Sequence, residues 1–176
     1  EDYACSPILD YIIEEGIDLF CVKACEGIGF SCEGYFRLKV PFDEVLIILF
    51  DNILDIDDKN SISAILMTSG EIFSIYNTNF QAETINRIIY IIVQIFKDPP
   101  DSFLKNSHNK TIDDTILPSL FYCINALIDG LGESFTNYLE QFYQVIEAFI
   151  CDESLLMRNN IILMSSHICF TCKIKN

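Results

Sequence analysis

The chain has 176 residues, of which 51% are hydrophobic, and this composition excludes an intrinsically disordered protein because it supplies enough apolar surface for a core. Its formal net charge of −15 argues against nucleic-acid binding, since an acidic surface repels phosphate groups. Charged residues interrupt the longest aliphatic run, which is far shorter than the roughly 20 residues of a membrane span, so no transmembrane helix is expected.

Predicted helices follow one another along the chain, separated by polar or proline-containing turns. Ser6 and Pro7 open a first helical stretch, and Pro41 begins a helix that runs to about Asp55. Further helices are expected at residues 61–77, 83–97, 113–131, 135–151 and 153–173, with Asp113 or Asp114 capping the one that begins there. Residues 99–111 open with two prolines and lack helical periodicity, which predicts a loop insertion.

Three of these segments repeat one apolar pattern. Aligning Asp98 with Asp152 pairs Ile85 with Leu139, Ile88 with Phe142, Ile89 with Tyr143, Ile91 with Val145, Ile92 with Ile146, Ile95 with Phe149 and Phe96 with Ile150. Aligning Asp55 with Asp98 adds a third copy, made of Phe42, Val45, Leu46, Ile48, Leu49 and Ile53, with Asn52 as a polar mismatch. Steps of three and four residues place each set on one helical stripe, whereas a strand would need alternation.

The repeat predicts the architecture. A helical hairpin with one broad apolar face cannot enclose that face alone, so successive copies are expected to share a continuous core. The expected fold is all-α, an α-solenoid of HEAT- or armadillo-type antiparallel helix pairs with about three to four repeats. Residues 1–176 would form a single segment, with units at about 17–58, 59–98 and 112–152 and a partial unit at 153–176.

Cysteine and histidine patterns do not indicate a catalytic or metal centre. Most of the eight cysteines lie in apolar helical patterns, so reduced core thiols are expected, with a disulfide scaffold as the alternative. Zinc is a further alternative, since soft ligands occur in two groups, Cys21, Cys25 and Cys32, and His167, Cys169 and Cys172, but neither group has the paired spacing of a structural zinc site. Neither His108 nor His167 is placed like a catalytic base. We predict no metal, no cofactor and no enzymatic activity.

One local motif points to a different class of protein. Residues Thr111 to Pro118 resemble the Asp-x-x-Leu-Pro segment of Vps9-type Rab guanine-nucleotide exchange domains, in which an acidic residue assists nucleotide release. That residue would be Asp114. The tyrosine and threonine of this family would fall near Leu163 and Ser166, which do not match, and a capped helix start explains the segment equally well.

A longer resemblance covers about residues 85–172. Leu131, Gly132 and Phe135, then Tyr138 to Phe142 with the sequence Tyr-Leu-Glu-Gln-Phe, and then a helix ending near Cys169 resemble the HEAT repeats of importin-β nuclear import receptors. The form there is Leu-Gly-x-x-Phe, Tyr-Leu, Glu, x, Phe and a following helix. A more diverged copy of the same scheme is visible at residues 24–36.

The resemblance implies a binding scaffold, a segment of a nuclear transport receptor found in the cytoplasm and nucleus. The implied partners are importin-α or basic cargo, Ran-GTP and Phe-Gly nucleoporins, without nucleic acid or membrane insertion. By analogy, exposed acids on the second helices would line the partner-binding face: Asp43, Glu44, Glu140 and Glu147. A solvated surface explains the same acids, and a HEAT scaffold of a non-transport complex is the alternative function.

Overall fold

A computed structural model describes residues 42–76, 80–106 and 109–173 of the chain. Predictions that fall on residues 1–41 therefore lie outside the described residues, as does that for His108. They concern the first helical stretch, the diverged copy at 24–36, and Cys5, Cys21, Cys25 and Cys32.

The described residues are predominantly helical, which confirms the prediction of an all-α fold. The helices are α3 (Phe42–Asn52), α4 (Lys59–Tyr76), α5 (Ala82–Lys97), α6 (Leu117–Leu131), α7 (Leu139–Phe149) and α8 (Leu155–Thr171). Within the described residues, 3₁₀ turns lie between these helices at Ile53–Asp55, Asp101–Phe103 and Gly132–Tyr138. No helix within the described ranges is long and apolar enough to cross a membrane.

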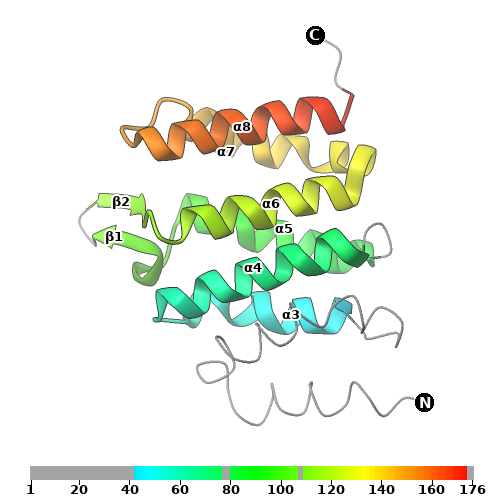
Figure 1. The fold of residues 1–176 in the computed structure, drawn as a ribbon, viewed down its shortest axis with the longest axis horizontal. Coiled ribbons are helices and arrows are strands. Elements are labelled where there is room, and N and C mark those ends of the chain that lie inside the picture. The colour runs from blue at the N-terminus through cyan, green and yellow to red at the C-terminus, as the bar shows by residue number, and fades with distance from the viewer. Residues whose placement is uncertain (1–41, 77–79, 107–108, 174–176) are drawn as a thin grey trace.

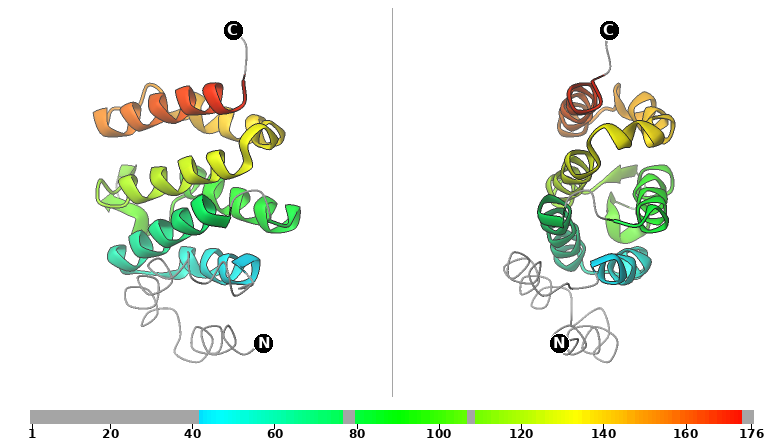
Figure 2. Two further views of the ribbon diagram at one scale, coloured as in Figure 1. Left: turned by 45° about the vertical axis from the view of Figure 1, so that its right-hand side comes forward. Right: turned by 90° about the vertical axis from the view of Figure 1, so that its right-hand side faces the viewer.

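The helices lie in two layers (Figure 2). We call α3, α5 and α7 the α3 layer, and α4, α6 and α8 the α4 layer. Within each layer a helix packs on the next member of the same layer: α3 on α5, α5 on α7, α4 on α6 and α6 on α8. Figure 1 shows the order, with α3 at one end of the described helices and α8 at the other. The three sequence copies thus fall on the three helices of the α3 layer.

The repeated apolar positions supply much of the core, but not equally in each copy. In α5 all seven are buried: Ile85, Ile88, Ile89, Ile91, Ile92, Ile95 and Phe96. In α7 only Phe142 and Val145 are buried, whereas Tyr143 and Ile150 are 59% and 43% exposed. The expectation that every aligned position faces a shared core is therefore wrong for α7, which of the described helices of its layer lies nearest the C-terminus.

The segment 99–111 is not the structureless loop that its prolines predicted. The helix α5 does end before them, but the segment continues into an antiparallel hairpin of β1 (Leu104–Asn106) and β2 (Asn109–Ile112), in which Leu104 pairs with Ile112. Phe103, Leu104 and Ile112 are buried, so apolar burial at the base holds the hairpin against the helices. Two short strands carry too little alternation to be read as a pattern.

The start of α6 also differs from the prediction. The helix begins at Leu117, four residues later than expected, with Pro118 in its first turn, and no side chain caps it. Asp113 instead accepts hydrogen bonds from the backbone N–H and the hydroxyl of Thr115, 2.9 Å and 2.6 Å long. This local turn competes with helix formation and delays the start of the helix.

Close packing of α4 on α6 depends on a glycine. A Cβ atom placed on Gly70 would lie 2.5 Å from Cε1 of Tyr122 and 3.4 Å from the Cα of Cys123. The tyrosine hydroxyl donates a hydrogen bond of 2.5 Å to Glu71, which fixes the ring over the glycine. Burial and the neighbouring Glu71 both raise the pKa of Tyr122.

Candidate functional site

The four acids predicted to bind a partner lie at two separate places on the α3 layer. Asp43 and Glu44 are in the first turn of α3, while Glu140 and Glu147 are on α7, and α5 lies between these two helices. Asp43 is engaged within the chain, because its Oδ1 accepts a 3.0 Å hydrogen bond from the backbone N–H of Gln81, just before α5. Glu44, Glu140 and Glu147 are exposed. The structure does not bring the four together.

Most described basic side chains are paired within the chain. Arg87 pairs with Asp51 at 2.5 Å, Lys105 with Asp114 at 2.6 Å, Lys59 with Asp113, and Lys173 with Glu133. Arg158 donates to the backbone carbonyls of Asp152 and Glu153. Four of these cations are paired with carboxylates, and the chain has 26 acidic side chains against 11 basic ones, so acidic groups dominate the field of the surface. Such a field attracts cationic groups.

An apolar groove of about 370 Å³ lies between α5 and α7. Its lining consists of Phe96, Lys97, Pro99, Gln144, Val145, Ala148 and Phe149. The rings of Phe96 and Phe149 contact each other in this lining, with centroids 5.6 Å apart, and Lys97 donates a 2.9 Å hydrogen bond to Gln144. A mostly apolar groove with a few polar groups suits an apolar side chain of a partner.

The repeat explains why this groove is open. Ala148 stands where α5 has Gln94, and Gln144 stands where α5 has Tyr90, so α7 carries the smaller residue at both positions. The aligned pair Gln94 and Ala148 was visible in the sequence, but the groove was not predicted. Its volume depends on how two helices pack, which a pattern along one helix does not describe.

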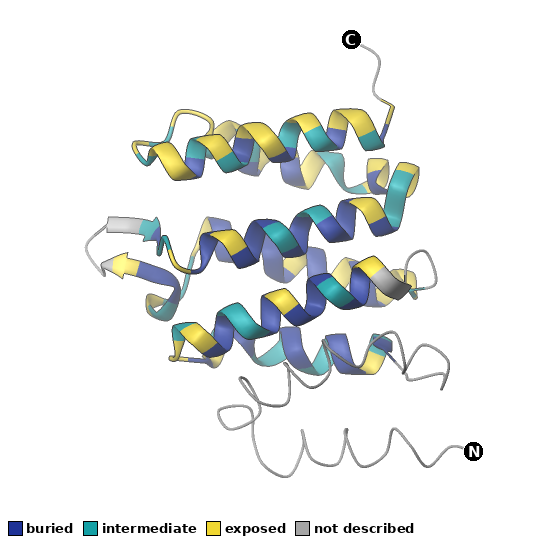
Figure 3. Ribbon diagram, in the orientation of Figure 1, coloured by how far each residue is buried: buried dark blue, intermediate teal, exposed yellow. Residues whose placement is uncertain are grey.

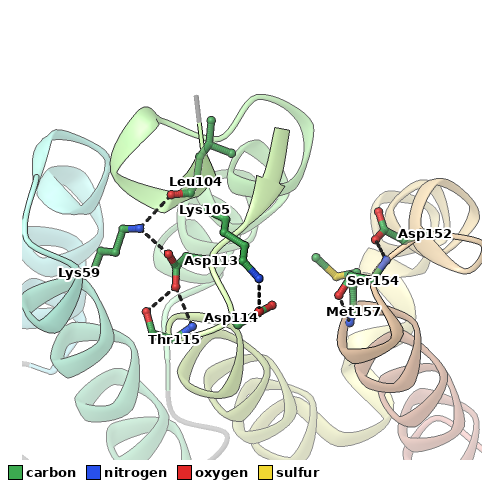
Figure 4. A network of polar contacts seen from close by, with 9 residues as sticks. All are labelled: Lys59, Leu104, Lys105, Asp113, Asp114, Thr115, Asp152, Ser154 and Met157. Carbon is green, nitrogen blue, oxygen red and sulfur yellow. Dashed lines mark hydrogen bonds and ion pairs between the residues drawn. The ribbon is translucent and has the colours of Figure 1, made fainter. Parts of the chain in front are cut away.

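A polar network ties the hairpin to the start of α4 (Figure 4). Lys59 pairs with the carboxylate of Asp113 and donates a 2.9 Å hydrogen bond to the carbonyl of Leu104. The bonds from Lys59 and Thr115 lower the pKa of Asp113 to about 2, because they favour the charged carboxylate. The side chain of Asp113 is 15% exposed. The network joins elements distant in sequence, and we assign it a structural role.

Ser154 and Asp152 organise the start of α8, also shown in Figure 4. The Ser154 hydroxyl accepts a 3.3 Å hydrogen bond from the backbone N–H of Met157, and Asp152 accepts one of 2.8 Å from the backbone N–H of Ser154. Asp58 acts similarly at the start of α4, where it accepts from the backbone N–H of Ser61. Carboxylates at helix starts are thus used to satisfy free backbone amides.

The described cysteines are free thiols: Cys123 and Cys172 are buried, and Cys151 and Cys169 are exposed. Burial raises the pKa of both Cys123 and Cys172, so neither is an activated nucleophile. Within the described ranges, no three histidine, cysteine or acidic side chains are grouped as metal ligands.

His167 has an acidic neighbour that sequence analysis missed. Its Nε2 lies 2.9 Å from Oδ1 of Asp129, which is close enough for an ion pair. The two groups are not oriented for a hydrogen bond. The acid is on α6 and the histidine on α8, so spacing along one helix gave no signal. The pair links two helices of the α4 layer.

The residues of the Rab-exchange motif do not form a cluster. Asp114 pairs with Lys105 of the hairpin, while Leu163 and Ser166 lie well within α8. Leu163 is 65% exposed, and the Ser166 hydroxyl donates a 2.9 Å hydrogen bond to the carbonyl of Ile162.

Comparison with known proteins gave no match: no family model, no curated protein and no solved structure is similar to this chain.

Proposed function

We propose that this chain is a protein-binding scaffold, a segment of an α-solenoid of HEAT type in an importin-β-like nuclear transport receptor. One observation carries the proposal. The three copies that align in sequence are the helices α3, α5 and α7, which are successive members of one layer and pack each on the next. Repeated hairpins of this kind offer long surfaces for partners rather than one deep active site.

Two surface features support the choice of partners. The acidic surface suits importin-α or basic cargo, since complementary charge steers association. The groove between α5 and α7 suits an aromatic side chain, such as the phenylalanine of a Phe-Gly nucleoporin, because apolar residues line it. A transport receptor of this class binds Ran-GTP and works in the cytoplasm and nucleus. These partners follow from the resemblance to importin-β.

A HEAT scaffold of a non-transport complex is the second candidate, favoured by the same packing. Rab exchange is a weaker candidate, because the carboxylate of Asp114 is paired with Lys105 and because Leu163 and Ser166 stand where the family has a tyrosine and a threonine. This candidate would be supported if the chain accelerated nucleotide release from a Rab protein and Asp114→Ala abolished the acceleration.

A pull-down tests the transport proposal. We expect the chain to retain importin-α, Ran-GTP and a Phe-Gly nucleoporin fragment at moderate salt. Ala148→Gln introduces the residue that α5 carries at this position and fills the groove, so it should weaken nucleoporin binding about tenfold, which corresponds to roughly 1.4 kcal/mol. The helix should tolerate it, because Ala148 is exposed and glutamine is a good helix former.

Ala82→Gln is the matched control, since Ala82 is also exposed but lies at the other end of α5. It should leave binding unchanged. If the wild-type chain retains neither importin-α nor Ran-GTP, the transport proposal is wrong, and the non-transport scaffold becomes the better one. Equal binding by both variants would exclude the groove as the nucleoporin site.

A further inference from the structure

The outward face of α8 carries no charge. The helix packs on α6 and α7, and its buried residues are Met157, Ile161, Met164 and Ile168. Its exposed residues are all uncharged: Leu155, Leu156, Asn159, Ile162, Leu163, Ser166, Cys169 and Phe170. The exposed residues of α5 include Glu83 and Arg87, and those of α7 include Glu140 and Glu147. An uncharged face is therefore a particular feature of α8 in a chain with a net charge of −15.

The same face exposes large apolar side chains along the whole helix (Figure 3). Their exposed fractions range from 40% for Leu156 to 84% for Phe170, with Leu155, Ile162 and Leu163 between these values. Scattered apolar residues are ordinary on a protein surface, but a continuous group of them marks an interaction surface.

The exposed residues of α8 form two apolar rows. Residues seven apart lie nearly above one another on a helix. One row is therefore Leu155, Ile162 and Cys169, and the other is Leu156, Leu163 and Phe170. Asn159 and Ser166 lie between the rows. Each row has its middle residue at the middle of the helix.

This arrangement is complementary to itself. When a second α8 lies antiparallel on the first, a two-fold axis passes between Ile162 and Leu163, and each row meets the same row of the second copy in reverse order. The contacts across the axis are then Ile162 with Ile162, Leu163 with Leu163, Leu155 with Cys169, and Leu156 with Phe170. Asn159 lies level with Ser166 of the second copy, where the amide can donate a hydrogen bond to the hydroxyl.

Charge also favours a second copy as the occupant of this face. Two copies repel each other over most of their acidic surface, but residues 155–171 contain no aspartate or glutamate, so the repulsion is smallest here. Cationic partners find no carboxylate on this face to bind. A helix of 17 residues is about 25 Å long. The interface is therefore smaller than about 1,200 Å², which is typical of a weak, reversible dimer.

We propose that α8 mediates self-association, in which two copies of the chain pair through antiparallel α8 helices about an axis between Ile162 and Leu163. The inference goes beyond the proposed function, because it names a second copy as a partner and uses a face without carboxylates. The match of each apolar row with its own reverse carries it.

Sedimentation velocity at micromolar concentrations tests the pairing. We expect dimers whose fraction rises with protein concentration and with salt, because salt screens the repulsion between acidic copies. Leu163→Glu places two carboxylates together at the axis and should raise the dissociation constant about tenfold or more. Tyr90→Glu is the matched control, since Tyr90 and Leu163 are 63% and 65% exposed but Tyr90 lies on α5. It should leave the dimer unchanged.

Both variants should keep the urea midpoint of the wild type, since both side chains are mostly in water. A chain that stays monomeric at all these concentrations would overturn the proposal. A dimer that Leu163→Glu leaves intact, or that Tyr90→Glu weakens equally, would also overturn it.

Leu155→Cys tests the antiparallel direction. In the proposed pair the new thiol lies beside the native Cys169 of the second copy, so oxidised glutathione should link the copies by a disulfide, seen on a non-reducing gel. Adding Cys169→Ser should abolish this link, because positions 155 and 169 are about 21 Å apart along the helix and the two new thiols are equally far apart. A link that persists after Cys169→Ser would indicate parallel helices and overturn the proposal.

Discussion

Replacing Ile89 by alanine should lower the free energy of unfolding by about 2–5 kcal/mol, whereas Tyr143→Ala should change it by less than about 0.5 kcal/mol. The two residues occupy the same position of the repeat, but Ile89 is fully buried and Tyr143 is 59% exposed. The first substitution removes buried methyl groups and leaves a cavity, and the second shortens a side chain that is mostly in water. Urea denaturation followed by circular dichroism measures both values.

Phe142→Ala adds a buried position of α7 to this comparison. Phe142 adjoins Tyr143 in the chain, is fully buried and packs on Phe135 with ring centroids 5.0 Å apart. A loss of about 3–5 kcal/mol is expected for it. Similar losses for Ile89→Ala and Tyr143→Ala would show that α7 is covered in the isolated chain, and the described end of the α3 layer would then be wrong.

The second large effect is a loss of stability at low pH, when the carboxylate of Asp113 is protonated. Asp113→Asn should lower the free energy of unfolding at neutral pH by about 1–2 kcal/mol, since one pKa unit corresponds to about 1.4 kcal/mol and the partly exposed Lys59 weakens the pair. The pKa of Asp113 is lowered from 3.8 to about 2 in the folded chain. Its contribution is therefore fully present above pH 3.8 and is lost as the pH falls towards 2.

The measurement is the urea midpoint at several pH values between neutrality and 2. The wild-type chain should lose more stability over the acid range than Asp113→Asn, because the variant has no carboxylate to protonate at this site. Asp114→Asn is the control: its carboxylate and Lys105 are 44% and 56% exposed, so the change should be below about 0.5 kcal/mol. Parallel pH profiles for wild type and Asp113→Asn would exclude the stabilising role of this network.

Sequence pattern predicted the helices well where one face of a helix decides its burial. In α5, all seven positions that steps of three and four residues located between Ile85 and Phe96 are buried, and Val93, which lies outside that pattern, is buried as well. The same pattern could not foresee that Tyr143 and Ile150 are exposed, because burial there depends on the next helix and not on α7 itself. Periodicity identifies the apolar face of a helix, and the neighbouring helices determine how much of that face is buried.

The candidate site was harder to predict for the same reason. The groove over Phe96 and Phe149, the pair of His167 with Asp129 and the network of Asp113 with Lys59 each join residues from different elements. Their spacing in the chain carries no fixed relation to their distance in space. The acids Asp43 and Glu140 were identified for their charge, but only the hydrogen bond from Gln81 to Asp43 suggests what that repeat position does.

Methyl NOEs between the helices test the stacked arrangement most directly. On a chain labelled at its isoleucine, leucine and valine methyls, we expect NOEs between α3 and α5, between α5 and α7, and along the α4 layer in the same order. None should connect α3 with α7, since α5 lies between them. NOEs from Leu49 to Val145 would instead indicate helices gathered around one centre, and would contradict a solenoid.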